Sequence, residues 1–316
     1  MSHTITNDLE RAQQEARARA ARLEQEPLAV TGPRGGFLTG PVIALGELVR
    51  HRELLDLLVR RELKSKYKDS ALGFLWSLAR PLTQLLIYAL VLGVFLGASR
   101  SIQNFAIFIF SGLTIYGLFS EIVLTMTASI VANAGLVKKV YLPREIFPAA
   151  AVGGALFNFA IQLALLAVAS AVMGALHLGG NLLYALAGTA VAVVWGCAIG
   201  LALGALNVYL RDMQYTTDIV VMLLMWFSPI VYSWTFVEVA VQQFGWPSWI
   251  HDVYMASPVT LSVIAYQHAF WGATPGAVMP PHLMTGLAIA FVIGLVALWL
   301  AQRLFARLEG NFAQEL

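Results

Sequence analysis

Long apolar stretches alternate with short polar segments along most of this chain. Six stretches reach about the 20 residues that a helix needs to cross the hydrocarbon core of a bilayer, and they lie at 75–98, 105–132, 148–175, 182–206, 218–236 and 283–302. They are continuous and lack the alternation of a barrel strand, so each predicts a membrane-spanning helix. The fifth is short and contains Ser228-Pro229, where we expect a kink or a break.

A segment with helical periodicity precedes the first apolar stretch. Its apolar residues recur at helical spacing, and most of its basic residues fall on the other side. We therefore expect an amphipathic helix at 44–69 that lies in the membrane interface. The alternative is a surface helix packed on a soluble domain, but the sequence predicts no other soluble domain. The candidate interface residues near the end of this helix are Arg60, Arg61, Lys64, Lys66, Tyr67 and Lys68.

Composition supports a membrane protein and predicts its orientation. Only 12% of the residues are charged, about half of the roughly 25% found in soluble domains. Lys and Arg concentrate before the first stretch, between the second and third, between the fourth and fifth, and after the sixth, whereas 212–302 contains neither. By the positive-inside rule, we expect a multi-pass protein of the inner membrane with both termini in the cytoplasm. Residues 1–43 read as a charged tail and a Gly/Pro linker, and 72–316 as the membrane domain.

The segment GLVKKVYLPREIFP (135–148) is a charged island between two apolar stretches. Lys138 and Lys139 alone would fit an ordinary cytoplasmic loop. The neighbouring apolar residues give the segment an apolar side, and Pro143 suits the first turn of a short helix. We expect a short amphipathic helix that docks on a cytoplasmic partner, with the next span starting at Pro148.

The 46 residues at 237–282 separate the fifth and sixth stretches. Their apolar part, 257–272, is too short to cross a bilayer. We expect one or two helices there that dip back into the outer leaflet, where protein can cover their ends.

Sequence motifs for catalysis are missing. The chain has no GxxxxGK[ST] phosphate loop, no HExxH, no GxSxG and no cluster of metal ligands. Cys197 lies within an apolar stretch and is expected to be a small buried hydrophobe. The basic residues follow membrane loops rather than one patch, so nucleic acid is not expected as a partner. The sequence predicts no catalytic residue, no metal site and no cofactor in this chain.

Polar and aromatic residues inside the apolar stretches are candidates for a translocation pathway. Glu121 is the clearest ionisable residue within a span, and such a residue indicates a functional site. It belongs to a stripe of small or polar residues that either packs against a neighbouring helix or lines a polar pathway. That stripe is Thr114, Gly117, Glu121, Thr125 and Ala128.

A second group of pathway candidates combines aromatic rings with amide or hydroxyl groups, which suits contact with sugars. Gln84, Tyr88 and Phe95 fall on one stripe of the first span, and Trp226, Ile230 and Ser233 on one stripe of the fifth. The alternative is the aromatic belt of membrane proteins together with ordinary packing.

Four stretches together resemble a known family. They are RRELKSKYKDSALGFLWSLARPL (60–82), LFSEIVLTMTASIVANAGLVKKVYLPREIFP (118–148), NVYLRDMQYTTDIVVMLLMWFSPIVYS (207–233) and FARLEGNFAQEL (305–316). The chain from about residue 44 onward resembles the transmembrane subunit of ABC-2-type exporters of lipid-linked polysaccharides, the class that handles O-antigen, capsule, teichoic acid and galactan. Arg80 departs from the small or polar residue expected there.

The resemblance implies an architecture and partners. Two copies of the subunit would form the channel, and two copies of a separate ATPase, which holds ATP and magnesium, would bind beneath it. It also implies that 44–68 is an interface helix, that the segment after the fifth span forms re-entrant gate helices, and that a lipid-linked glycan and membrane lipids are the ligands. The implied coupling helix contains Lys138, Lys139, Tyr141, Pro143, Arg144 and Glu145.

Three alternatives stay open at this point. An autonomous secondary transporter would show inverted repeats and paired helix breaks, and a membrane enzyme would need clustered carboxylates or basic residues at one interface. The sequence shows neither pattern. Within the exporter class, the substrate could instead be a drug or a lipid without glycan.

Overall fold

The computed structural model describes residues 36, 39–67, 75–95, 97–139, 142–175, 179–272 and 274–316. Every regular element in these ranges is a helix, as the sequence predicts. The predicted tail and linker at 1–43 lie almost entirely outside the described residues.

Four helices in the described ranges are long and apolar enough to cross a membrane. They are α5 (Phe105–Ala132), α7 (Ile146–Val172), α8 (Leu182–Tyr209) and the stretch Leu283–Glu315, which begins with α13 (Leu283–Leu308). Two shorter apolar helices, Pro81–Phe95 and Met213–Phe227, occupy the first and fifth predicted spans. The chain is thus a multi-pass membrane protein, and the count of six spans stays a prediction.

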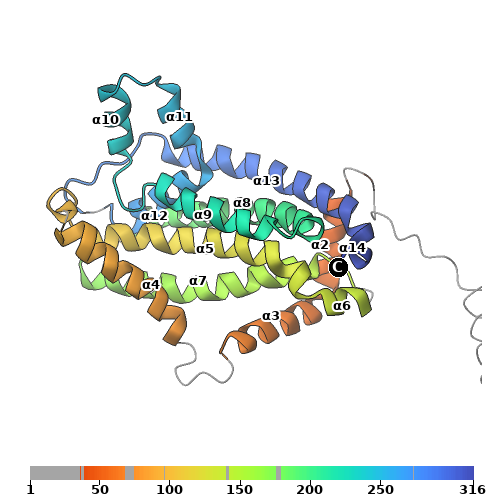
Figure 1. Ribbon diagram of the computed structural model, residues 1–316. Coiled ribbons are helices and arrows are strands. Elements are labelled where there is room, and N and C mark those ends of the chain that lie inside the picture. Colours follow the sequence, from red (N-terminus) through yellow and green to blue (C-terminus); the bar gives the residue numbers. More distant parts are fainter. Residues whose placement is uncertain are drawn as a thin grey trace, which may run out of the picture. The chain divides into compact units, whose positions relative to one another are not determined.

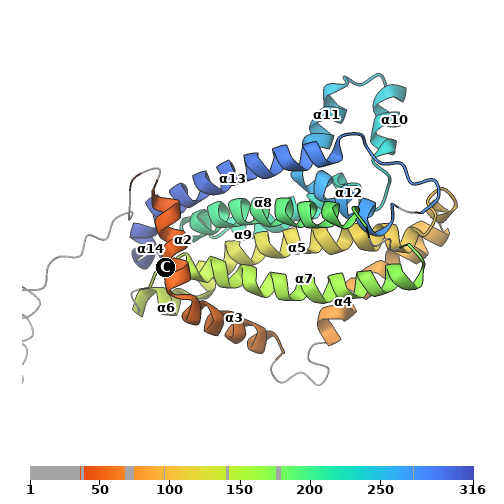
Figure 2. The same cartoon turned by 180° about the vertical axis from the view of Figure 1, so that it is seen from behind.

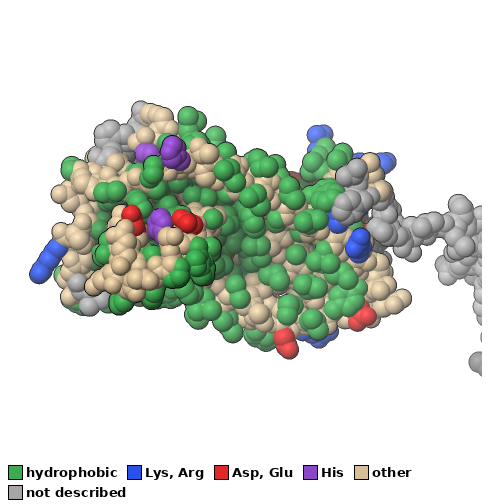
Figure 3. Space-filling model, turned by 90° about the horizontal axis from the view of Figure 1, so that it is seen from above, with side chains coloured by type: hydrophobic (Ala, Val, Ile, Leu, Met, Phe, Trp, Pro, Cys, Tyr) green, Lys and Arg blue, Asp and Glu red, His purple; other side chains and the backbone are tan. Residues whose placement is uncertain are grey.

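Helix α5 lies at the centre of the bundle (Figures 1 and 2). It packs against α7, α8 and α12 (Pro258–Phe270), and α13 packs on the other side of α8. In its most apolar 18-residue window, 78% of the residues are buried, against 22% in α7 and α13. The outer helices therefore leave apolar side chains exposed, as a helix facing lipid does. In Figure 3 hydrophobic side chains cover the middle of the visible face, and Lys and Arg lie at its ends.

A row of glycines brings α8 close to α5. Gly196, Gly200 and Gly204 repeat every fourth residue along α8 and face α5. A Cβ added to Gly204 would lie 2.8 Å from the backbone oxygen of Met126. Small residues at this spacing let two membrane helices approach until their backbones touch, and the sequence analysis above did not use this pattern.

We expect Gly204→Ala to destabilise the protein. The added methyl group would lie against the backbone of α5, which cannot move aside as a flexible side chain can. Overpacking of this kind typically costs about 1–3 kcal/mol. The matched control is Gly46→Ala, since nothing lies within 4 Å of a Cβ at Gly46. The melting temperature of the purified protein should fall for Gly204→Ala only. Equal melting temperatures for the two variants would mean that α5 and α8 are not in close contact.

The fifth predicted span is broken where the sequence predicts it. Helix α9 (Met213–Phe227) ends before Ser228, whose backbone is extended at φ −91° and ψ 149°. Pro229 lacks the N–H that would continue the helix. The Pro229 carbonyl oxygen, which lies beyond the end of α9, accepts a hydrogen bond from the Gln267 side-chain amide on α12 at 2.6 Å, so this group is satisfied inside the protein.

The break after α9 separates the residues of one predicted stripe. Because α9 ends at Phe227, Trp226, Ile230 and Ser233 do not share a helix face. Ile230 is fully buried, and the Ser233 hydroxyl instead accepts a hydrogen bond from Thr235 at 2.9 Å.

The first predicted span also changes along its length. Helix α4 (Leu75–Tyr88) continues as the π-helix η1 (Ala89–Phe95), which is followed by the short 3-10 helix η2 (Ala98–Arg100). The wider turn of a π-helix rotates the residues that follow it. Phe95 is 76% exposed, whereas Gln84 and Tyr88 are partly buried.

Three helices follow the break in the fifth span. They are α10 (Thr235–Gln243), α11 (Trp249–Ala256) and α12. In Figure 1, α10 and α11 stand at one end of the bundle, whereas α12 lies among the long helices. Eleven of the thirteen residues of α12 are buried, and its Tyr266 hydroxyl lies 2.6 Å from that of Thr189 on α8. A helix does occupy 257–272 as expected; its re-entry into a leaflet stays a prediction.

The expected single helix at 44–69 begins earlier than expected and is divided in two, and residues 68–69 lie outside the described residues. The structure has α2 (Gly40–Arg50) and α3 (Arg52–Tyr67), separated at His51. The His51 ring nitrogen Nδ1 lies 2.8 Å from the Glu47 carbonyl oxygen, which also accepts a hydrogen bond from the His51 backbone N–H. Helices α2 and α3, on either side of His51, have different neighbours.

Helix α2 keeps its apolar side chains Val42, Leu45 and Val49 exposed, as a helix in the membrane interface would. Helix α3 turns its apolar face onto α7 instead.

Candidate functional site

The charged island lies at the end of the bundle where α3, α6, α7 and α14 meet (Figure 1). We call this region the basic end. Helix α6 (Ala134–Lys139) follows α5 directly, and α7 begins at Ile146. The predicted short helix is therefore present but lies earlier than expected. Pro143 is outside it in a non-helical stretch, and Pro148 falls in the first turn of α7 rather than at its start.

Helix α6 is anchored on one side and open on the other. Val137 is buried, whereas Lys138 and Lys139 are exposed. Pro143, Arg144 and Glu145 are partly buried in the following turn. The position of Tyr141, the remaining candidate for coupling, lies outside the described residues. Two exposed ammonium groups on a short, anchored helix are available for contact with another protein.

An aromatic cluster supports Arg144 from inside. The guanidinium carbon of Arg144 lies 5.8 Å from the ring centre of Phe312 in α14 (Phe312–Glu315), within the range of a cation–π contact. Phe312 is fully buried and packs edge-on against Phe305, with ring centres 5.3 Å apart, and against Tyr209 at 6.2 Å. The Tyr209 hydroxyl donates to the Leu308 carbonyl oxygen at 2.8 Å. We call Tyr209, Phe305 and Phe312 the aromatic anchor.

Helix α3 is fixed to the same end of the bundle. A Cβ on Gly153 of α7 would lie 2.6 Å from the Val59 side chain, so the two helices touch closely. Arg61 donates a hydrogen bond to the Asn133 side-chain oxygen at the end of α5. The basic end is therefore a continuous body through which a push on α6 or on Arg144 could reach α3, α5 and α7.

Two other interface candidates on α3, Arg60 and Lys64, are exposed. Arg60 forms an ion pair with Asp56 at 2.8 Å, but both side chains are more than half exposed, so the pair contributes little. Lys64 is exposed. Lys66 and Tyr67 belong to the α3 backbone, whereas their side chains, and Lys68 as a whole, lie outside the described residues, as does the side chain of Arg80.

A buried arginine holds α2 against α13. Arg303 is buried and donates to the side-chain oxygen of Gln302 at 2.7 and 2.9 Å and to the carbonyl oxygen of Gly36 at 3.0 Å. Gly40 lies directly on this guanidinium, which a Cβ at Gly40 would overlap. Arg303, expected only as a cytoplasmic charge, thus also positions the start of α2.

The pathway candidates separate into two places. Gln84, Tyr88 and Trp226 come together on the face formed by α4 and α9. The Gln84 amide nitrogen lies 3.4 Å from the Tyr88 hydroxyl, and the Tyr88 and Trp226 rings meet edge-on with centres 6.5 Å apart. Trp226 is half exposed. Among the described residues, neither Phe95 nor Ser233 forms a hydrogen bond or a ring contact with this group.

Glu121 faces a different neighbour. Its Oε1 accepts a hydrogen bond from Asn158 on α7 at 2.6 Å, and Gln162 of α7 lies opposite Gly117 one turn away. Gly117 and Glu121 of the predicted stripe therefore face α7. Thr125 and Ala128 of the same stripe line a pocket beneath α3. The sequence analysis missed Asn158, although an amide inside an apolar stretch calls for a hydrogen-bonding partner.

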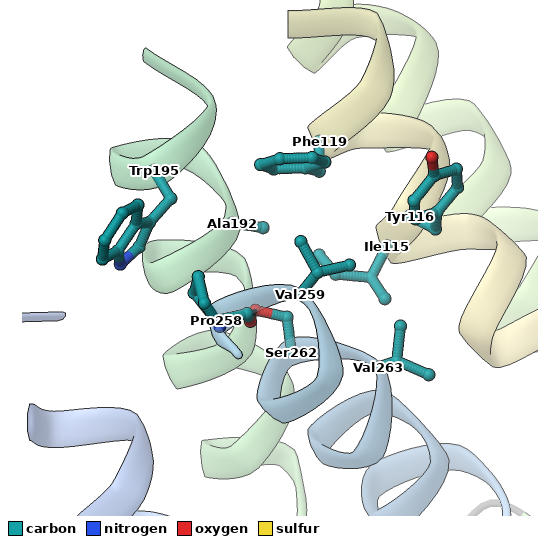
Figure 4. Close-up of a pocket in the computed structure, with 9 residues that line it drawn as sticks. All are labelled: Ile115, Tyr116, Phe119, Ala192, Trp195, Pro258, Val259, Ser262 and Val263. Carbon is teal, nitrogen blue, oxygen red and sulfur yellow. Dashed lines mark hydrogen bonds between the residues drawn. The ribbon is translucent and has the colours of Figure 1, made fainter. Parts of the chain in front are cut away.

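A hollow between α5, α8 and α12 is too small for a ligand (Figure 4). Its lining is almost entirely apolar and leaves no room for a water molecule. Trp195, at its edge, donates to the Ala290 carbonyl oxygen on α13 at 2.9 Å. This hollow does not provide a route through the subunit.

Titratable side chains of the described residues do not gather into a metal-binding group of three or more His, Cys, Asp or Glu.

Comparison with known proteins gives matches along most of the chain. The model of the ABC-2 type transporter family matches residues 53–271. The chain is 28% identical over 271 residues to the O-antigen export system permease protein RfbA of Myxococcus xanthus, a match that covers 85% of this chain and 98% of that protein. It is 23% identical over 268 residues to the O-antigen export system permease protein RfbA of Klebsiella pneumoniae, covering 84% of this chain and 95% of that protein.

Proposed function

The chain belongs to the ABC-2 type transporter family, and from that premise we propose that it is the membrane-spanning permease subunit of a polysaccharide exporter. Its substrate would be a lipid-linked polysaccharide of the O-antigen, galactan or teichoic-acid type, moved from the cytoplasmic to the outer face of the inner membrane. A separate ATPase subunit would supply the energy, and this chain would carry out no chemical reaction.

The observation that carries the proposal is the extent of the match to O-antigen permeases. It covers 98% of the Myxococcus protein, so the likeness extends over the whole membrane domain rather than one motif. The basic end adds a physical argument, because Lys138 and Lys139 are exposed on a helix held by the bundle. A partner that binds there gains direct contact with the ends of the spans.

In the proposed mechanism, ATP binding closes two ATPase subunits beneath two copies of this chain. Their movement displaces the segment 134–148. Arg144 passes the displacement to the aromatic anchor and so to the ends of α8 and α13, while α6 passes it to α5. Because Arg61 links the end of α5 to α3, the interface helix moves with them.

We place the route for the glycan between the two copies, on the face of α4 and α9. Gln84, Tyr88 and Trp226 lie on that face, where ring faces and an amide suit sugar C–H and hydroxyl groups. The face also exposes Leu86, Ile219 and Leu223, which a second copy or lipid would cover. Glu121 lies instead between α5 and α7, so in this mechanism it holds those helices together.

The proposal is tested by reconstituting the chain in liposomes together with a separate ATPase subunit that co-purifies with it. ATP should drive a lipid-linked glycan to the opposite leaflet, where an added glycosidase or lectin detects it. The control is the same complex with an ATPase variant that binds but does not hydrolyse ATP.

The substrates that are transported decide between export of a lipid-linked glycan and export of a drug or a lipid without glycan. Transport of a lipid without glycan, or of a hydrophobic drug, at the rate found for the lipid-linked glycan would show that the sugar is not recognised. Transport in the absence of the ATPase would make the chain an autonomous transporter.

A further inference from the structure

A pocket of about 270 Å³ lies at the basic end, between α3, the last turns of α5 and the first turns of α7. It exists because four of the residues that line it are alanines, and α3 bridges the gap that their short side chains leave. Its volume is several times the roughly 30 Å³ of one water molecule. It is large enough for a small polar headgroup.

Apart from Arg61 and the second N–H of the Asn133 amide, the polar groups of the lining act as acceptors. The hydroxyl of Thr125 donates to the Glu121 carbonyl oxygen at 2.6 Å, and that of Ser129 donates to the Met126 carbonyl oxygen at 2.7 Å. Both hydroxyl protons are therefore used within α5, and only the oxygen lone pairs remain for a ligand. The Asn133 amide likewise donates to the Ser129 carbonyl oxygen at 2.8 Å.

Two charged residues of opposite sign complete the lining. Arg61 donates one N–H to the Asn133 side-chain oxygen, and a guanidinium has five. Glu62 contributes a carboxylate, whose two oxygens accept about four hydrogen bonds, so a contact within the protein leaves acceptor capacity. The pocket thus offers a cationic donor beside a set of acceptors that includes one anion.

This arrangement matches a ligand that carries both an anion and an ammonium group. A ligand with phosphate alone would place its charge near Glu62, and a simple cation would lie near Arg61. Phosphoethanolamine satisfies both, since its phosphate accepts from a guanidinium and its three ammonium protons need acceptors. We propose that the pocket binds the headgroup of a phosphatidylethanolamine-type lipid, with the phosphate on Arg61 and the ammonium on Glu62, Thr125 and Ser129.

The position of the pocket agrees with a lipid ligand. It lies at the ends of α5 and α7, two helices long enough to cross a membrane, and beneath a helix with one apolar and one basic side. Headgroups lie at this depth in a bilayer. A bound lipid would tie α3 to the corner between α5 and α7. The inference requires a membrane protein with this fold and does not depend on which substrate it exports.

The test measures lipid binding by the purified full-length protein, in complex with its ATPase, by native mass spectrometry and thermal melting. The probes are phosphatidylethanolamine, phosphatidylcholine and phosphatidylglycerol with identical acyl chains. The native chain should bind phosphatidylethanolamine most tightly and melt highest in its presence. Arg61→Gln should weaken this binding about tenfold or more, as the loss of a hydrogen bond to a charged group does. Arg61→Lys, which keeps the charge, should weaken it less.

Glu62→Gln is the sharper variant. It removes the partner of the ammonium group but keeps the shape of the side chain, so the preference for phosphatidylethanolamine over phosphatidylglycerol should disappear. The matched controls are Arg52→Gln and Glu53→Gln. They change the same pair of residue types on α3, both exposed and outside the pocket lining, and should leave the preference intact.

Three results would overturn the proposal. Equal binding of phosphatidylethanolamine and phosphatidylcholine would show that the pocket does not recognise the N–H groups of the ammonium. A native preference for phosphatidylglycerol would make the pocket a plain anion site. If the Arg61 and Glu62 variants bind lipid as the controls do, the ligand lies elsewhere.

Discussion

Replacing Arg144 and Glu145 together by alanine should abolish export while the subunit still inserts and assembles. Both residues lie in the turn between α6 and α7, partly exposed, where the proposed ATPase contact is made. Arg144→Ala also removes the cation over the Phe312 ring. Losing charged groups that are paired across an interface costs about 2–5 kcal/mol of binding free energy, enough to uncouple the two subunits. The measurements are export in cells, the amount of subunit in the membrane, and ATPase activity of the purified complex.

The control for this variant is Arg100→Ala, together with Ser101→Ala. Arg100 and Ser101 are also exposed and adjacent, but they lie in the loop before α5, at its other end. They should leave export unchanged. Normal export by the Arg144 and Glu145 variant would show that the 134–148 segment does not transmit the movement of the ATPase subunits to the membrane helices.

Phe312→Ala should release the coupling segment from the bundle. Phe312 is fully buried against Phe305 and Tyr209 and lies under Arg144, and removing a buried phenyl ring typically costs about 3–5 kcal/mol. Because α14 is only four residues long and packs at the end of the bundle, we expect it to detach locally instead of unfolding the whole protein. Export should fall strongly, the C-terminus should become sensitive to protease, and ATP hydrolysis by the complex should continue.

Phe236→Ala serves as the matched control, because Phe236 is 54% exposed and lies on α10. Phe312→Leu should give an intermediate loss, since leucine fills part of the space without a ring face for Arg144. If Phe312→Ala keeps both full export and protease resistance, the aromatic anchor has no part in coupling.

The apolar pattern predicted the long helices well because a bilayer leaves little freedom. A span needs about 20 apolar residues, and α5 begins and ends at the residues expected. The break at Ser228-Pro229 was predictable because proline removes a donor. The π-helix after Tyr88 and the division at His51 were not predicted, since the spacing of apolar residues does not reveal a local change of helix geometry.

Contacts between helices were the least predictable part of the candidate site. The sequence placed Glu121 on a polar stripe but left two interpretations open, and the answer depended on Asn158 of α7. The role of Phe312 could not be predicted, because its partners Arg144 and Tyr209 are far away along the chain. The short helix of the charged island was expected near Pro143 but forms at 134–139, where its buried apolar residue is Val137.

The proposed mechanism requires above all that the charged island faces the cytoplasm. Cys197 is the chain's single cysteine, so a Cys197→Ala background allows a single reporter to be introduced. Lys139→Cys should react with a membrane-impermeant maleimide in inside-out vesicles only, and Arg100→Cys in right-side-out vesicles only. Labelling of Lys139→Cys from the outside would invert the topology, place the island beyond the reach of any ATPase, and contradict the proposed mechanism.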